Sequence, residues 1–156
     1  MSELDKIDLR LLEMLQLDAR KSVKAMALEV GLTSTPVYER IKKLEQQGYI
    51  KRYGINLDLD KIGLGLTVFC QVILKTHSKT LIRNFEHSLQ SISEVAEVYH
   101  TSGEYDYLLK VICEDNHAYH RFIIDKLSAL DMVSKVQSNF VLSELKSFEH
   151  IPLLRT

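Results

Sequence analysis

The stretch GLTSTPVYERIKKLEQQGYI, residues 31–50, decides the fold of the N-terminal third of the chain. It opens with three consecutive hydroxyl residues and a proline, which suits the first turn of a helix because proline has no N–H to pair. Apolar Val37, Ile41 and Leu44 then recur at helical spacing. The pattern predicts an amphipathic helix with a polar tip that begins near Thr35.

Two further helices are expected upstream of this one. Residues 5–18 carry apolar side chains at helical spacing, namely Ile7, Leu11, Met14 and Leu15. A second helix should span Val23 to Val30, with Ser22 as its N-cap and Gly31 ending it in the left-handed conformation. The sequence therefore predicts a three-helix, winged-helix-like domain with a helix-turn-helix at its centre, over residues 1–52.

The outer side of the third helix is polar and basic. Although the whole chain has a net charge of −1, residues 20–52 hold eight basic and three acidic side chains. The N-terminus of a helix attracts phosphate, and lysine or arginine can reach phosphates or guanine edges. These features predict docking in the DNA major groove, with contacts from Ser34, Thr35, Pro36, Tyr38, Glu39, Arg40, Lys42 and Lys43. The alternative is a plain solvated face, which Glu39 and Glu45 would also suit.

The composition is that of a globular protein. The 156 residues are 46% hydrophobic and 26% charged, and no apolar run approaches the ~20 residues that span a bilayer. The charged N-terminus is unlike a secretory signal, so we expect a cytoplasmic protein without membrane contact. Cys70 and Cys113 lie in strand-like runs without metal-ligand spacing. They are interpreted as core residues, with no metal or cofactor expected.

The remaining two thirds alternate between strand and helix patterns. Residues 53–65, with two glycines near their end, are expected to form a hinge or linker strand. In residues 66–156 we expect strands at about 66–75, 94–101, 107–113 and 133–146, and helices at about 78–90 and 115–130. The order β-α-β-β-α-β is that of a ferredoxin-like domain, so the whole chain is predicted to be α+β.

The first strand of this domain is apolar on both sides. Four of its core-type residues alternate with Phe69 and Ile73, and the third strand repeats the pattern with Leu108 and Ile112. In a ferredoxin-like arrangement both helices cover one face of the sheet, so the other face should be polar in a monomer. A second copy of the sheet is the simplest cover, which predicts a homodimer. The alternative cover is the N-terminal domain.

Together these stretches resemble the Lrp/AsnC transcription regulators. LDKIDLRLLEMLQLDAR, GLTSTPVYERIKKLEQQGYIKRY and TSGEYDYLLKV stand in the family's order, and the resemblance covers roughly residues 3–150. It implies a DNA-binding domain hinged to an amino-acid-sensing domain, in dimers that often assemble further, commonly to octamers. It further implies that an effector binds between dimers. Gly103, Glu104, Tyr105 and Asp106 match the family's effector-binding turn, and Thr101 and Ser138 are expected to contribute hydroxyls.

The chemistry of the turn at residues 101–106 suits a free amino acid. Backbone N–H groups around a glycine can hold a carboxylate, and Asp106 can accept an ammonium group. The alternative is an ordinary hairpin turn capped by Asp106. The chain departs from the family pattern at Ser34 and Ala25. Asn116 and His117, at the start of the last predicted helix, are placed where a ligand response could be tuned.

Taken together, the sequence predicts a regulator that binds a pseudo-palindromic operator through paired helices about one DNA turn apart. One rival interpretation is an enzyme on a ferredoxin-like dimer, with candidates His100, Cys113, His117 and His120. His117 and His120 are three residues apart on a helix, but no third metal ligand is placed by any pattern. Another rival is a stand-alone small-molecule sensor, against which the basic third helix argues.

Overall fold

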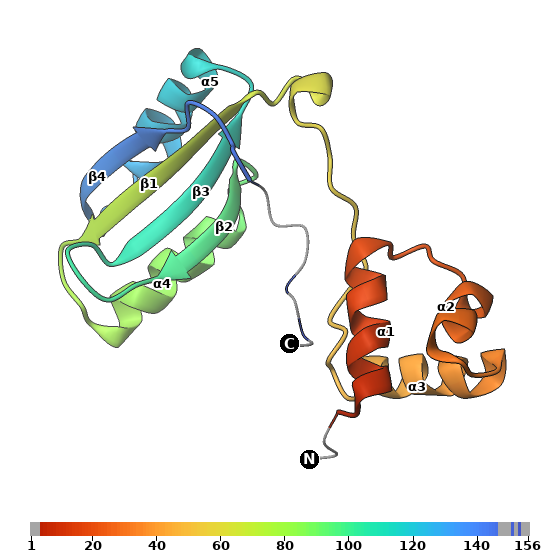
Figure 1. Cartoon of the computed structure of the whole chain (residues 1–156). Coiled ribbons are helices and arrows are strands. Elements are labelled where there is room, and N and C mark those ends of the chain that lie inside the picture. The colour runs from red at the N-terminus through yellow and green to blue at the C-terminus, as the bar shows by residue number, and fades with distance from the viewer. Residues whose placement is uncertain (1–3, 147–150, 152, 154–156) are drawn as a thin grey trace. The chain divides into compact units, whose positions relative to one another are not determined.

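The chain folds into two compact units. The computed structural model describes residues 4–146, 151 and 153. The helical unit contains the chain up to Asn56 together with the C-terminal segment from Leu145, and the sheet unit is Leu57–Glu144. Figure 1 shows three helices in the first unit and a sheet flanked by helices in the second.

The helical unit consists of α1 (Lys6–Leu17), α2 (Val23–Val30) and α3 (Ser34–Gln46). Each of the first two helices is capped by the residue just before it. Asp5 and Asp8 form a reciprocal capping box on α1, and the Ser22 hydroxyl accepts a hydrogen bond from the backbone of α2. Gly31 takes the left-handed conformation (φ 69°) and ends α2, as predicted.

The core of the helical unit is small. Its buried cluster consists of Leu11, Met14, Met26, Ala27, Val37 and Ile41. Leu44 of α3 is also buried, so the predicted inner face of this helix is confirmed. Helix α3 begins at Ser34, one residue earlier than predicted, and no side chain caps it. In the described residues that follow α3 within this unit there is no strand, so the structure shows the three helices without a wing.

The sheet unit has the predicted β-α-β-β-α-β order. After a 3-10 turn, η1 (Asp60–Ile62), its elements are β1 (Leu66–Leu74), α4 (Lys79–Gln90), β2 (Val95–His100), β3 (Tyr107–Cys113), α5 (Asn116–Arg121), the π-helical η2 (Phe122–Leu127) and β4 (Val133–Phe140). The strand order is β2-β3-β1-β4, and all pairings are antiparallel. The predicted α+β, ferredoxin-like fold is confirmed.

Two elements differ in detail from the prediction. Strand β4 ends at Phe140, six residues before the expected end. The last helix changes to a π-helix at Phe122, with a hydrogen bond from the Ser128 N–H to the Ile123 carbonyl. The wider turn brings Phe122 and Leu127, five residues apart, into the core, while Lys126 faces outward and pairs with Glu94.

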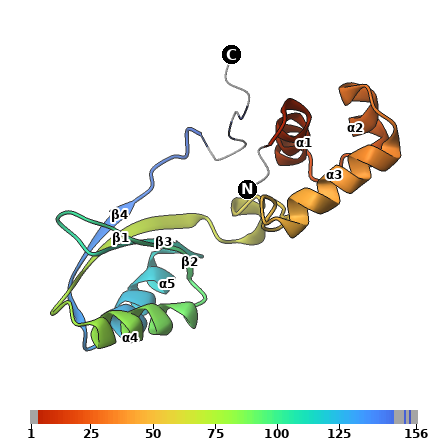
Figure 2. The same ribbon diagram turned by 90° about the horizontal axis from the view of Figure 1, so that it is seen from below.

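The two faces of the sheet differ. Figure 2 shows α4 and α5 on one face, and there the alternate residues of β1 and β3, including Cys70 and Cys113, are buried. The other face, here called the open face, is formed by the residues that alternate with these buried ones along β1 and β3. Its apolar residues on β1 and β3 are Phe69, Ile73, Leu108 and Ile112, all half-buried. Gln71 and Lys110 interrupt this surface, so the second apolar face is present but mixed.

Candidate functional site

The outer face of α3 presents a row of polar side chains to solvent. Thr35, Glu39 and Lys43 are exposed, and Tyr38 is 52% exposed. Because Thr33 provides no side-chain cap, the first N–H groups of the helix remain open to an anion. Among the described residues, none forms an ion pair with Lys43. Lys43 can therefore meet a phosphate without first breaking an ion pair with another described residue.

Arg40 has a structural role that the sequence did not suggest. One of its guanidinium nitrogens lies 2.7 Å from a carboxylate oxygen of Asp5 and 2.7 Å from one of Asp8. The hydrogen bonds that Arg40 donates to Asp8 and Asp5 raise the pKa of Arg40 above its ordinary value. Arg40 therefore clamps α3 onto the N-terminus of α1, and a DNA contact from it, which stays a prediction, would compete with this clamp.

Lys42 is also partnered, but more loosely. Its ammonium lies 3.0 Å from Glu45 and 5.8 Å from the centre of the Tyr38 ring. The hydrogen bond to Glu45 raises the pKa of Lys42. This exposed pair is one turn apart on the same helix, an arrangement that contributes little to stability. Lys42 can therefore exchange Glu45 for a phosphate at small cost.

The turn between β2 and β3 is held in shape by its own backbone. The N–H of Thr101 donates to the Asp106 carbonyl at 2.8 Å, and the Thr101 hydroxyl donates to the Tyr105 carbonyl at 2.9 Å. Gly103 has φ 137°, which side-chain-bearing residues rarely adopt. Among the described residues, none accepts a hydrogen bond from the N–H of Gly103 or Glu104. These two donors are free for a ligand.

Asp106 is already engaged within the chain. One carboxylate oxygen accepts the Leu74 N–H at 2.7 Å, and the other lies 2.8 Å from the His77 ring. Burial raises the pKa of Asp106, but the Leu74 N–H and His77 lower it by more, so the net pKa is below the ordinary 3.8. The expectation that Asp106 accepts a ligand ammonium stays untested. In the structure this carboxylate holds the turn against β1 through its hydrogen bond with the Leu74 N–H.

A small hollow lies where the turn meets the open face. It is lined by Gln71, Ile73, Glu104, Tyr105, Lys135 and Gln137. Its volume is about 70 Å³, room for about two water molecules at ~30 Å³ each. A whole amino acid would need further walls, such as a second subunit. Sequence reasoning missed the residues from β1 and β4, although strand alternation places them on the same face as Phe69.

Ser138 does not join the other predicted effector residues. Its hydroxyl accepts a hydrogen bond from Tyr119, whose oxygen also lies 3.1 Å from the Cys70 sulfur. Ser138 lines a different hollow, together with Asn116 and residues at the end of β4. In strand register it pairs with Cys70, whose side chain is in the core. Within one chain, strand alternation places Ser138 on the helix-covered face of the sheet, away from the turn, and its contact with an effector stays a prediction.

The candidates for an enzyme are dispersed. His100 stacks on Tyr107 with ring centres 4.6 Å apart, and Cys113 is buried in the core of the sheet unit. Within residues 4–146, 151 and 153, no three His, Cys, Asp or Glu side chains gather closely enough to hold a metal ion. The same residues contain no helix long and apolar enough to cross a membrane.

Comparison with known families matches both units. Residues 4–51 match a winged helix-turn-helix DNA-binding domain, and residues 67–151 match the Lrp/AsnC ligand-binding domain. The chain is 36% identical over 150 residues to the DNA-binding transcriptional activator DecR of Escherichia coli, which covers 96% of this chain and 99% of the relative. It is 32% identical to the Bkd operon transcriptional regulator of Pseudomonas aeruginosa, over 93% of this chain and 95% of the relative.

Solved structures agree with these sequence matches. A transcriptional regulator from Neisseria meningitidis, solved as a complex with L-Met, has a TM-score of 0.92 and 32% identity, and the match covers 97% of each chain. The structure of E. coli AsnC has a TM-score of 0.84 and 27% identity, covering 99% of this chain and 97% of that one.

Proposed function

The chain belongs to the Lrp/AsnC family of transcriptional regulators, and on that premise we propose that an amino acid bound at the 101–106 turn controls how paired α3 helices grip an operator. The helical unit is the DNA-binding module and the sheet unit the ligand-binding module. We place the module boundaries near residues 52 and 66. The relatives are transcriptional regulators, so neither an enzyme nor a stand-alone sensor is favoured.

The DNA contact is assigned to the outer face of α3. The observation that carries this assignment is an uncapped helix N-terminus with Thr35 in its first turn, and Lys43 in the last turn of the same helix, both exposed and unpaired among the described residues. We propose that Ser34, Thr35, Pro36, Tyr38, Glu39, Lys42 and Lys43 meet the major groove, while Arg40 positions the helix. Phosphate contacts set affinity and register, and Thr35 and Glu39 are placed to read bases.

Salt dependence of DNA binding tests this assignment. Operator fragments are first selected from genomic DNA by the purified protein, and affinity is then measured by fluorescence anisotropy from 50 to 400 mM salt. Lys43→Ala should reduce the slope of log K against log salt by about 1, because one phosphate is left without its cation. Lys79→Ala, which removes an exposed lysine from α4 in the other module, is the matched control and should change nothing. Equal slopes for both variants would sink the assignment.

The effector site is assigned to the turn and the hollow beside it. We propose that the N–H groups of Gly103 and Glu104 hold the carboxylate of an amino acid. The Glu104 side chain then takes the ammonium, because the oxygens of Asp106 are occupied. Thr101 and Tyr105 shape the turn. The similarity to a regulator solved with L-Met supports the ligand class.

Assembly follows from the open face of the sheet. Each half-buried apolar residue there can gain free energy, at roughly 25 cal/mol per Å² of apolar surface removed from water. We propose that two ligand-binding modules pair through this face, that dimers assemble further, as far as an octamer, and that the protein acts in the cytoplasm where its operator lies. Pairing also supplies the walls that the 70 Å³ hollow lacks.

A thermal-shift screen with the twenty amino acids tests the effector site. A ligand that binds only the folded protein raises the melting temperature with concentration. Glu104→Gln should abolish the shift caused by the best ligand. Glu114→Gln, another exposed carboxylate of the same module, should preserve that shift. If Glu104→Gln keeps the full response, the ammonium contact lies elsewhere.

A further inference from the structure

Helix α1 has a second apolar face that the core of the helical unit does not use. Leu11 and Met14 are buried against α2 and α3, whereas Leu9 and Leu12 do not belong to that cluster. Instead they border a hollow of about 540 Å³ within the helical unit. The other residues around it are Leu4, Leu15, Gln16, Ala19, residues 49–54, Ile151 and Leu153.

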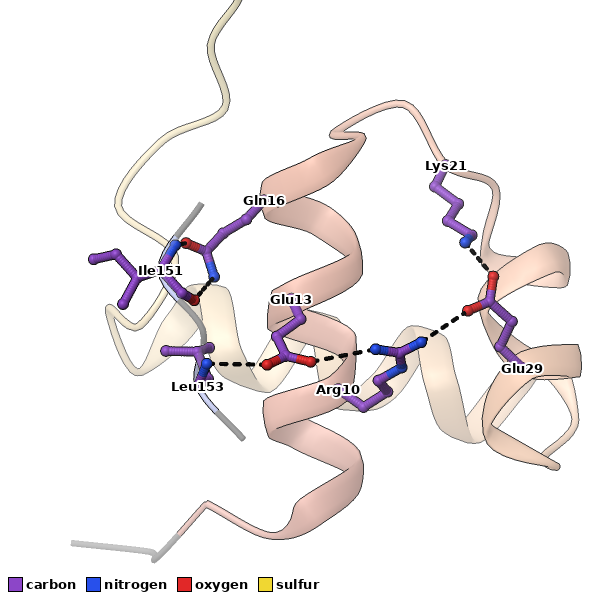
Figure 3. Close-up of polar contacts among 7 residues, drawn as sticks. All are labelled: Arg10, Glu13, Gln16, Lys21, Glu29, Ile151 and Leu153. Carbon is purple, nitrogen blue, oxygen red and sulfur yellow. Dashed lines mark hydrogen bonds and ion pairs between the residues drawn. The ribbon is translucent and has the colours of Figure 1, made fainter. Parts of the chain in front are cut away.

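The C-terminal segment of the chain is seated on this face. The Gln16 side-chain amide donates to the Ile151 carbonyl at 3.2 Å, and its oxygen accepts the Ile151 N–H at 2.9 Å. Beyond the next residue, a proline that has no N–H, Leu153 donates its N–H to Glu13 at 3.0 Å. Figure 3 shows the three bonds side by side along α1.

We propose that this face of α1 is a docking site for the chain's own C-terminal segment. The contact resembles the addition of a strand to a sheet edge. The Gln16 side chain takes the place of a neighbouring strand, because it bonds to both the N–H and the carbonyl of Ile151. The apolar side chains of Ile151 and Leu153 border the hollow beside Leu9 and Leu12. Backbone bonds fix the register, and the leucines supply apolar contact.

The docking site is linked to the helix-turn-helix by charged side chains. Glu13, which receives the Leu153 N–H, also pairs with Arg10 at 3.3 Å. Arg10 reaches Glu29 of α2 at 3.7 Å, and Glu29 pairs in turn with Lys21 (Figure 3). Its hydrogen bond with Lys21 lowers the pKa of Glu29. The ion pairs thus form a continuous row of contacts from the docked segment to α2.

Docking also gives the chain a second connection between the two modules. The first connection between the modules is the segment that leads from α3 to β1. Strand β4 ends at Phe140, and eleven residues later Ile151 is fixed to α1. A segment of that length spans at most about 40 Å, so a seated tail is a second tether of limited reach. If the proposed function holds, releasing or seating the tail is a means of coupling ligand state to DNA grip.

Hydrogen exchange on the full-length protein, read by mass spectrometry, tests the docking without DNA or ligand. The Ile151 and Leu153 amides should exchange at least tenfold more slowly than in an unstructured peptide of the same sequence. Gln16→Ala should remove the protection of Ile151. Leu17→Ala, its 63% exposed neighbour on α1, should leave that protection intact. Wild-type amides that exchange at the unstructured rate overturn the proposal, and so does protection that survives in Gln16→Ala.

A second variant acts from the tail and cannot disturb α1 itself. Leu153→Asp should release the segment and speed the exchange of the Ile151 amide. Leu142→Asp, at a side chain that is 98% exposed, is the matched control and should not. An unchanged Ile151 amide in Leu153→Asp would contradict the docking. Because neither measurement involves an operator, loss of DNA binding alone would count against the proposed function and not against the docking.

Cross-linking decides whose tail is seated. In the double variant Gln16→Cys, Ile151→Cys, a short bismaleimide should join the two positions within one chain, since the native cysteines are buried. The product should run as a monomer on a denaturing gel. A cross-linked dimer would show that the tail comes from another subunit and would overturn the assignment to the same chain.

Discussion

The two modules reach stability by different means. Among the described residues, the main buried cluster of the ligand-binding module has thirteen members, whereas that of the DNA-binding module has six. The smaller core is supplemented by polar contacts: the capping box of Asp5 and Asp8, the Arg40 clamp and the seated tail. A small domain buries too little apolar surface to rely on it alone. In the smaller module, a polar residue on the surface of a DNA-binding helix, such as Arg40, can therefore contribute to stability.

The largest expected effect is in the core of the ligand-binding module. Phe85 is fully buried and packs on Tyr107 with ring centres 4.9 Å apart. Phe85→Ala should cost about 3–5 kcal/mol, because the cavity cannot collapse fully. Calorimetry should show this loss in the transition that includes the unfolding of the ligand-binding module. Ile124→Ala, at a 52% exposed side chain, is the control and should cost little.

A smaller and pH-dependent effect is expected at Asp106. Asp106→Asn keeps the size of the side chain but removes its charge, at a cost of about 1–2 kcal/mol at pH 7. The pKa of Asp106 is lower in the folded than in the unfolded chain, so its stabilisation is complete above about pH 5. It disappears as the pH falls through the folded pKa.

Chemical denaturation at pH 7 and near pH 2.5 measures this dependence. The gap in unfolding free energy between wild type and Asp106→Asn should close at the lower pH. Asp125→Asn, an exposed carboxylate of η2, provides the baseline for a simple change of charge. A gap of constant size would mean that the charge of Asp106 is not what fastens the turn.

Substitution of Arg40 distinguishes a structural arginine from a DNA-contacting one, because the first changes stability and the second changes the salt dependence of DNA binding. Arg40→Met should destabilise the DNA-binding module by roughly 1 kcal/mol, a modest value because Asp5 is half exposed. The salt slope of DNA binding should stay as in wild type, whereas Lys43→Met should lower it by about 1. Lys24→Met removes an exposed charge from α2 and controls for stability. A reduced slope in Arg40→Met would restore the sequence-based assignment.

Periodicity predicted most of the fold correctly. The helices, the order of helices and strands along the chain, and the inner faces of α3, β1 and β3 follow from apolar spacing, which local sequence carries directly. The π-helical turn at Phe122 was missed because α-helical spacing fits Phe122 and Ile123 equally well. Only the packing of Leu127 against the sheet decides between the two.

The candidate sites were less predictable because partners distant in sequence decide them. Arg40 and Asp5 are 35 residues apart, and no local pattern announces their ion pair. Likewise, the sequence favours Asp106 as a ligand contact, and it does not reveal that one of its carboxylate oxygens accepts the Leu74 N–H. The sequence alone also did not reveal that Ser138 pairs with Cys70, a register that places it on the helix-covered face within one chain.

The smallest expected effect decides whether the two modules are independent at all. Ser22 and Ser78 cap α2 and α4 in the same way, each accepting a backbone hydrogen bond, at 3.2 and 3.3 Å. Either serine replaced by alanine should cost about 1 kcal/mol. If the modules unfold separately, Ser22→Ala lowers only the transition of the DNA-binding module, and Ser78→Ala only that of the other. If the seated tail makes them one cooperative unit, both variants shift a single transition, and deleting residues 147–156 should then split it in two.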